Sequence, residues 1–298
     1  MLLGAGAVWI GLRLAGGGAT GGLDPRTVLV APFQNLSPDA AVAPVSLMAA
    51  EAVSRGLLET GLVRVVALPT TVADGGTDGE LRAAARREQA GLLVTGSTYF
   101  IDGRLELRTR LVDTATGKLV FALEPANGPL SEAAQVVDAA AQSVMGAVSV
   151  HLDPPLGLGP VVRPPPFRAL SEYRAGMRGS GGNWVEASHH FERAAQLAPD
   201  FRGAQLRLIM AYQVLGEKEK QDELRSRLRA GAGEFTPFEK LLFDLYEARV
   251  EKRSADALRI LRILRTQAPE DIFFKVLTAL LADQQLDLDE VVTCLGDL

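Results

Sequence analysis

The sequence is poor in the residues from which many functional sites are built. It has one cysteine, Cys294, among 298 residues, which excludes an intrachain disulfide and a metal site made of several cysteines. Aromatic residues make up only 6% of the chain, and 31 basic residues against 36 acidic ones give a net charge of −5. Because nucleic-acid binding requires a concentrated basic face, this composition argues against a nucleic-acid partner.

The short motifs of common catalytic classes are also missing. The chain has no His-Arg-Asp or Asp-Phe-Gly triplet and no glycine loop followed by a strand lysine, which kinases require. Ser97 lacks the Gly-x-Ser-x-Gly surroundings of a hydrolase nucleophile. His189 and His190 would point about 100° apart on a helix, which is poor geometry for holding one metal ion. We therefore expect a protein that is not an enzyme, with no catalytic, cofactor-binding or metal-binding residues and no cofactor.

What the chain does contain is a pattern that occurs twice, 70 residues apart. Small and large apolar residues at this spacing mark the face of a helix that packs on a preceding helix, and the proline ends it. Seventy is twice 35, close to the 34-residue period of tetratricopeptide repeats. Two further large residues sit at the usual offsets of an intervening helix. The predicted structural signature is Ala187, Phe191, Ala194 and Pro199, repeated as Ala257, Leu261, Leu264 and Pro269, with Leu208 and Tyr212 between them.

The second half of the chain is expected to be a helical array. Hydrophobic periodicity predicts a first helix from Phe167 to the GSGG break, followed by helices over 184–197, 201–215, 218–230, 237–250, 254–267 and 271–284. The helix 218–230 departs from the pattern, because Gln221 and Arg225 replace a small residue and an aromatic one, so its packing is in doubt. A last helix starts at Asp289 and the chain stops within it, which predicts a truncated array.

The first half predicts alternating strands and helices. Strands are expected over 26–33, 62–68, 91–100, 104–112 and 118–123, and helices over 45–60, 78–89 and 131–150. Asp102-Gly103 is a strong signal for a two-residue hairpin turn. This order implies a mixed sheet with helices packed on it. The expected fold class is therefore a small mixed-sheet α/β domain followed by a tetratricopeptide-like helical array.

Two stretches of the first half carry a family resemblance. VLVAPFQNLSPD with the later LVRVVALPTTV, and AGLLVTGSTYFIDGRLELRTRLVDTATGKLV, are similar to the amino-terminal domain of TolB and its relatives. The resemblance covers roughly residues 26–150. It implies a binding or scaffolding domain of bacterial envelope assemblies rather than a catalytic unit.

The whole arrangement resembles the C-terminal extracytoplasmic region of certain bacterial membrane-bound Ser/Thr protein kinases. There a kinase domain precedes one transmembrane helix, a TolB-like domain and tetratricopeptide repeats; the kinase is absent here. Residues 1–22 are apolar and then glycine-rich, and a membrane span lacking its first turns, a signal-peptide core or a disordered leader would fit them; we favour the span. The expected units are 1–22, a TolB-like domain over 23–152, a semi-rigid proline-rich linker over 153–166 and the array over 167–298.

These observations lead to two hypotheses about function. The first is a membrane-tethered, single-pass scaffold or sensor, mostly extracytoplasmic, which binds a protein or peptide through its helical repeats. Arg174 and Arg178 are the expected residues of its partner groove. The alternative is the regulatory C-terminal fragment of a membrane-bound Ser/Thr protein kinase or a related signalling protein.

Overall fold

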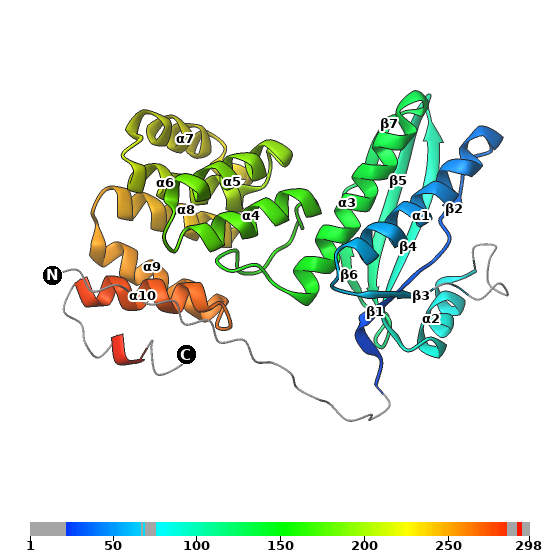
Figure 1. The fold of residues 1–298 in the computed structure, drawn as a ribbon, viewed down its shortest axis with the longest axis horizontal. Helices are drawn as coiled ribbons and strands as arrows, with labels where there is room; N and C mark the ends of the chain where they lie inside the picture. Colours follow the sequence, from blue (N-terminus) through cyan, green and yellow to red (C-terminus); the bar gives the residue numbers. More distant parts are fainter. Residues whose placement is uncertain (1–21, 67, 69–75, 285–290, 294–298) are drawn as a thin grey trace.

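The computed structural model describes residues 22–66, 68, 76–284 and 291–293 (Figure 1). The expected N-terminal membrane segment, except for residue 22, lies outside these residues, as do residues 289, 290 and 294 of the expected last helix at 289–294. No helix within the described ranges combines the length and the apolar character that crossing a bilayer requires. The chain forms an α/β domain followed by a helical array, which is the predicted fold class.

The α/β domain is built on one mixed sheet. Its main strand order is β3-β1-β4-β5-β6, with β2 beside β4 and β7 beside β5. Strand β1 pairs in parallel with β3 and β4, and β2 pairs in parallel with β4. Strand β5 runs antiparallel to β4, β6 and β7. The strands are β1 Asp24–Val30, β2 Gln34–Asn35, β3 Arg64–Val66, β4 Ala90–Ile101, β5 Arg104–Asp113, β6 Leu119–Ala122 and β7 Ala126–Pro129.

Two turns connect the antiparallel strands β4, β5 and β6. Asp102 (φ 50°) and Gly103 (φ 77°) both adopt positive φ and join β4 to β5, as the Asp-Gly signal predicts. After β5, the Asp113 carboxylate accepts hydrogen bonds from the backbone N–H and the hydroxyl of Thr116, at 2.7 and 2.6 Å. These bonds lower the pKa of Asp113 and fix the turn into β6. The sequence prediction missed β2 and β7, which are too short to show periodicity.

Helices cover both faces of the sheet (Figure 1). On one face, α1 (Ala43–Glu59) and α3 (Ala133–Leu152) pack together over a large apolar core that includes Val53, Leu92 and Val144. On the other face, α2 (Asp78–Arg87) covers a smaller core around Leu29 and Leu93. Strands that are buried on both faces explain the continuous apolar runs of β1 and β4.

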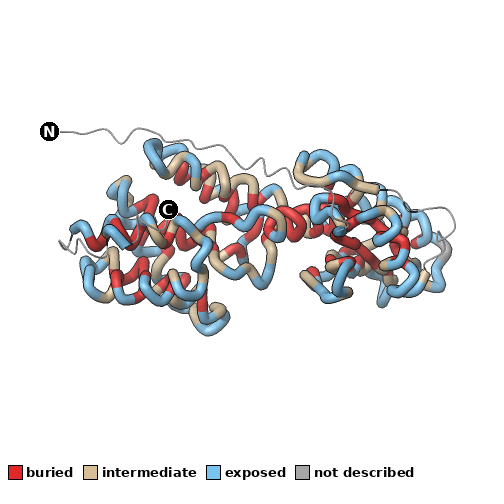
Figure 2. Tube along the Cα trace, turned by 90° about the horizontal axis from the view of Figure 1, so that it is seen from below, coloured by how far each residue is buried: buried red, intermediate tan, exposed pale blue. Residues whose placement is uncertain are grey.

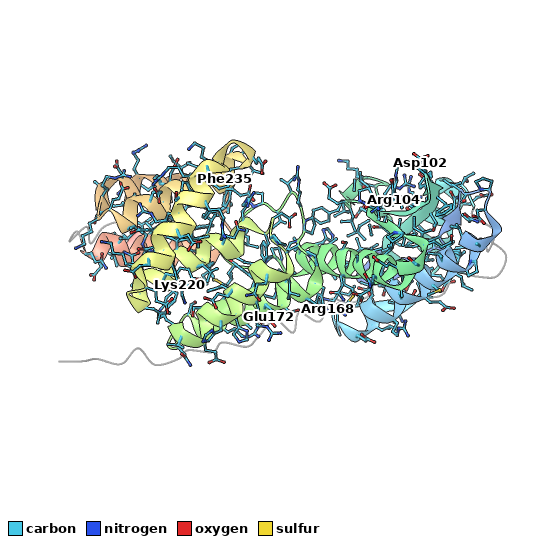
Figure 3. The ribbon with its side chains drawn as sticks, turned by 90° about the horizontal axis from the view of Figure 1, so that it is seen from above. Asp102, Arg104, Arg168, Glu172, Lys220 and Phe235 are labelled. Atoms are coloured by element: carbon cyan, nitrogen blue, oxygen red, sulfur yellow. The ribbon has the colours of Figure 1, made fainter. Side chains whose placement is uncertain are left out.

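The array begins where α4 packs along α3, with contacts that run from Asp138 to Ser149. The carboxylate of Asp138 on α3 holds the Arg168 guanidinium in a two-pronged ion pair, at 2.8 and 3.2 Å. Figure 3 shows Arg168 near this junction between the two units. The array helices are α4 Phe167–Gly179, α5 Trp184–Leu197, α6 Arg202–Leu215, α7 Lys218–Ala230, α8 Pro237–Val250, α9 Ser254–Gln267 and α10 Ile272–Gln284.

Local sequence signals begin and end these helices. The Thr236 hydroxyl accepts from the backbone N–H of Glu239 at 3.2 Å, and the Glu239 carboxylate accepts from the backbone N–H of Thr236 at 2.8 Å, which starts α8. Gly216 ends α6 with a φ of 72°, in the left-handed region. Figure 2 shows buried stretches alternating with exposed ones along the array, as expected of helices that bury one stripe.

Candidate functional site: two faces of the helical array

The segment between the two units folds onto the array. We call the face formed by α4, α6, α8 and the start of α10 the inner face. Residues 155–161 lie against it and are called the inner segment. The hydroxyl of Tyr173 on α4 donates to the backbone carbonyl of Leu156 at 2.8 Å. Leu158 is 8% exposed and belongs to the apolar core of the array. The structure therefore differs from the expected semi-rigid connector: this part of the linker is packed.

Asp271, just before α10, holds the inner segment. Gly157 donates its backbone N–H to Asp271 Oδ2 at 2.6 Å, and the backbone N–H of Gly159 acts on the pKa of the same carboxylate. Burial raises the pKa of Asp271, although these hydrogen bonds act against the shift. Gly157 and Gly159 have φ values of 73° and 59°, which side chains rarely adopt. A Cβ at Gly159 would also lie 2.0 Å from the ring of Phe238 on α8.

Arg207 of α6 lies under the inner segment with an unpaired nitrogen. Its Nε donates to the Tyr173 hydroxyl at 3.2 Å, and its guanidinium carbon stacks 3.7 Å from the ring centroid of Phe273. Nη2 is buried and has no hydrogen-bond partner among the described residues. A Cβ at Gly157 would lie 1.6 Å from this Nη2. Burial also raises the pKa of Tyr173 to about 12. The inner segment therefore covers a polar group that it does not satisfy.

A second hollow lies on the other side of α6. We call it the outer groove: it has a volume of about 790 Å³ and lies between α5 and α7. Successive helix residues point about 100° apart, so residues two positions apart face nearly opposite sides of a helix. Gln205 lines the outer groove, and Arg207 therefore faces the opposite side of α6. The apolar floor is formed by Leu208, Tyr212, Leu224 and Leu228. Charged residues of both signs line it as well: Glu192, Arg202, Lys220, Glu223 and Arg227.

Part of the charge in the outer groove is already paired. The Tyr212 hydroxyl donates to Glu192 Oε1 at 2.9 Å, and burial together with this bond raises the pKa of Tyr212. Lys220, labelled in Figure 3, has its Nζ 2.6 Å from a Glu217 carboxylate oxygen. Glu223 and Arg227 are exposed and form no ion pair within the described part of the chain. These two side chains are open to a partner.

The residues of the predicted repeat signature fall into three places. Leu208 and Tyr212 are buried and form part of the floor of the outer groove. Pro199 and Pro269 are exposed, just after α5 and α9 end. The assignment of the pattern to tetratricopeptide repeats stays a prediction. The six helix-face residues have no exposed surface: Ala187, Phe191, Ala194, Ala257, Leu261 and Leu264.

The two arginines expected in a partner groove lie on α4. Arg174 Nη2 is 3.1 Å from the carboxylate of Asp153 and donates to the backbone carbonyls of Asp153 and Ser149, at 2.5 and 3.3 Å. Burial lowers its pKa. Arg174 thus ties the end of α3 to α4, while Arg178 is exposed. Neither lines the outer groove, and their role in partner binding stays a prediction.

The doubtful helix of the array is held by polar contacts. Gln221 on α7 is buried and donates from Nε2 to the backbone carbonyl of Ile209 at 3.0 Å. Arg225 donates to Glu247 on α8 at 2.5 Å, and Arg229 bonds the other oxygen of that carboxylate. Burial opposes ionisation of Glu247, but the hydrogen bonds from Arg225 and Arg229 outweigh it and lower its pKa. The sequence pattern marked these positions as irregular without indicating their partners.

The histidines of the array lie near carboxylates of neighbouring residues. His190 Nδ1 lies 2.7 Å from Glu172 on α4 and its other ring nitrogen is 3.9 Å from Glu186. Across the described ranges, no group of three or more His, Cys, Asp or Glu side chains is placed to hold a metal ion.

No protein-family model matches the chain, and no curated protein matches it. Among solved structures, it is similar to the LpoB C-terminal domain from Salmonella enterica, at 16% identity over 35% of this chain and 83% of that chain, with a TM-score of 0.30. TolB from Acinetobacter baumannii is similar at 17% identity and a TM-score of 0.31, over 44% of this chain and 29% of the TolB chain. Lipoprotein GNA1162 from Neisseria meningitidis is similar at 18% identity and a TM-score of 0.28, over 35% of this chain and 81% of that chain. TM-scores of this size do not establish a shared fold or role, so the assignments above depend on the chain's own topology.

Proposed function

We propose that this chain is a non-catalytic protein-interaction module whose array binds a segment of a partner protein in the outer groove. The observation that carries the proposal is an open hollow of about 790 Å³ with an apolar floor and unpaired charges of both signs. Sites that bind ligands are typically concave and largely apolar, with a few polar groups that set orientation. A fitting partner presents apolar side chains flanked by one acidic and one basic residue, which complement Arg227 and Glu223.

The unpaired charges favour specificity over raw affinity. Exposed ion pairs contribute little binding energy, whereas side chains that fill a desolvated floor contribute most. We therefore infer that the partner's apolar side chains above Leu224 and Leu228 provide the affinity, and that Glu223 and Arg227 select its orientation.

Site-specific crosslinking tests this proposal. A photoreactive amino acid at Glu223 should yield a discrete adduct in cells that make the full chain, and the same group at Arg259, exposed on α9, should not. Adding Arg227→Glu should weaken the adduct without lowering the melting temperature, because Arg227 is exposed. Equal adducts at both positions, or none at Glu223, would overturn the proposal.

We also propose that residues 1–22 tether the module to a membrane, with the rest extracytoplasmic. The apolar stretch of the sequence supports this part. The full chain should stay with membranes in an alkaline wash, and a chain lacking residues 1–22 should be released. Release of both chains would contradict the tether and leave the outer groove proposal untouched.

A further inference from the structure

We propose that the inner face is a second peptide-binding surface, which the chain's own inner segment occupies. It accepts in exchange a partner segment of the same chemistry and backbone conformation: a leucine flanked by two glycines. This inference goes beyond the outer groove and concerns different residues on the opposite side of α6.

The contacts to the inner segment are those of a bound peptide. Two hydrogen bonds reach backbone atoms: the carbonyl of Leu156 and the N–H group of Gly157. One side chain, Leu158, enters the core, where its Cδ2 would be 2.2 Å from a Cβ at Gly203 of α6. Recognition of backbone atoms together with a pocket for one side chain does not depend on the covalent link to α3.

The two glycines define which segments fit. A side chain at Gly157 would collide with Arg207, and one at Gly159 would collide with Phe238, while both positions also need positive φ. The inner face therefore selects glycine at two positions by excluded volume and by backbone conformation.

The inner segment can be released because its bound state leaves a buried donor unsatisfied, which water can satisfy once the segment leaves. Arg207 Nη2 remains buried without a partner, and an unsatisfied buried donor is costly. The inner segment has no regular secondary structure of its own and is joined to α3 through Asp153. A tethered segment of this kind competes at an effective concentration on the order of millimolar. Partners from solution therefore bind well only when the inner segment has been released.

A peptide-binding measurement tests the exchange. The probe is a labelled peptide with the sequence of residues 153–163, and the receptors are the full wild-type chain and a full chain in which 155–161 is replaced by a Ser/Gly segment of equal length. By fluorescence anisotropy, the replaced chain should bind the peptide at least tenfold more tightly than wild type. Wild type binding equally well, or a folded replaced chain that does not bind, would overturn the proposal.

Matched variants separate this site from the outer groove. A peptide with alanine in place of Gly159 should bind the replaced chain at least tenfold more weakly, and Tyr173→Phe in that chain should weaken binding severalfold. Arg227→Glu, in the outer groove, should leave peptide binding unchanged. Equal binding of the alanine peptide would overturn the proposed selection for glycine.

The wild-type chain provides a readout that does not depend on whether the replaced chain folds. Unlabelled peptide at millimolar concentration should displace the inner segment and speed hydrogen exchange at the backbone N–H of Gly157, which otherwise bonds to Asp271. Unchanged exchange at that position would overturn the proposal even if the replaced chain were unfolded.

Discussion

Helices α5 and α7 hold equivalent places in successive helix pairs, but different forces hold them. The apolar residues that α5 buries are Ala187, Phe191 and Ala194. The Phe191 ring lies 5.7 Å from that of Tyr173 on α4, directly above Gly176, where a Cβ would come within 2.6 Å of it. This helix is anchored by apolar packing on the helix that precedes it.

Thirty-four positions later, the same places on α7 carry Gln221, Arg225 and Leu228. Here the contacts are hydrogen bonds to a backbone carbonyl on α6 and to Glu247 on α8. Apolar packing is non-directional and tolerates small shifts, whereas a buried ion pair is stable only when both partners are in place. We infer that α5 depends on apolar packing against α4, before it in the chain, while α7 depends on polar contacts to α6, before it, and to α8, after it.

The largest expected effect comes from breaking the apolar side of this comparison. Phe191→Ala removes a fully buried ring, and we expect a loss of about 3 to 5 kcal/mol in the free energy of unfolding. Urea denaturation followed by circular dichroism measures it. Val185→Ala, an exposed position on α5, is the matched control and should change stability by less than about 0.5 kcal/mol. A loss from Phe191→Ala no larger than the control's would refute the packing argument.

The ion pair on α7 should matter less than the aromatic ring. Glu247→Gln removes the least exposed of the three carboxylates that pair with Arg225, and we expect a loss of about 1.5 to 3 kcal/mol, the value for hydrogen bonds to charged groups. A double-mutant cycle with Arg225→Met isolates the coupling between the two residues. Additive losses would show that Arg225 and Glu247 do not act as a pair.

The pH dependence of stability should differ between wild type and the Glu247→Gln variant. The pKa of Glu247 is lowered from its ordinary value of 4.5, so its ionised form stabilises the fold above that pH. This stabilisation is lost as the pH falls through the lowered pKa. Urea midpoints measured from pH 6 downward should fall more steeply below about pH 4.5 for wild type than for the variant. Parallel curves would mean that Glu247 has the same pKa in both states.

The smallest effect is expected at Gln221. Gln221→Ala removes one neutral hydrogen bond to the Ile209 carbonyl, which costs about 1 kcal/mol. Gln196→Ala, at an exposed position on α5, serves as its control. If Gln221→Ala destabilised the array as much as Phe191→Ala, polar and apolar anchoring would not differ as proposed.

Much of the fold could be predicted because its signals are local. The helices expected at 184–197, 218–230, 237–250 and 254–267 have the same bounds in the structure, since caps, prolines and periodicity act within a few residues. The Asp102-Gly103 turn is equally local. By contrast, β3 begins at Arg64, two residues after the expected start of the strand over 62–68. The strand β7 carries Gly128 and Pro129, which are poor strand formers.

The candidate sites could not be predicted because their contacts are long-range. Proline and glycine in the linker suggest an exposed spacer, but the bond that holds Gly157 crosses 114 positions to Asp271. The outer groove likewise combines three helices, and its floor residues, such as Leu224, are indistinguishable by sequence from ordinary core. A signal was present at Arg225, because a charged residue stands where the predicted repeat has an aromatic one. At this position an ion pair with Glu247 replaces apolar packing.

The long reach of Asp271 has a consequence for synthesis of the protein. The inner segment leaves the ribosome just after the α/β domain is complete, but its carboxylate partner is translated 114 residues later. At about 5 to 20 residues per second, this interval is roughly 6 to 23 s. In the later part of this interval α4 and α6 have been translated, but the segment that covers their inner face still lacks its bond to Asp271. The nascent chain therefore passes through an open state that the finished protein reaches only by exchange.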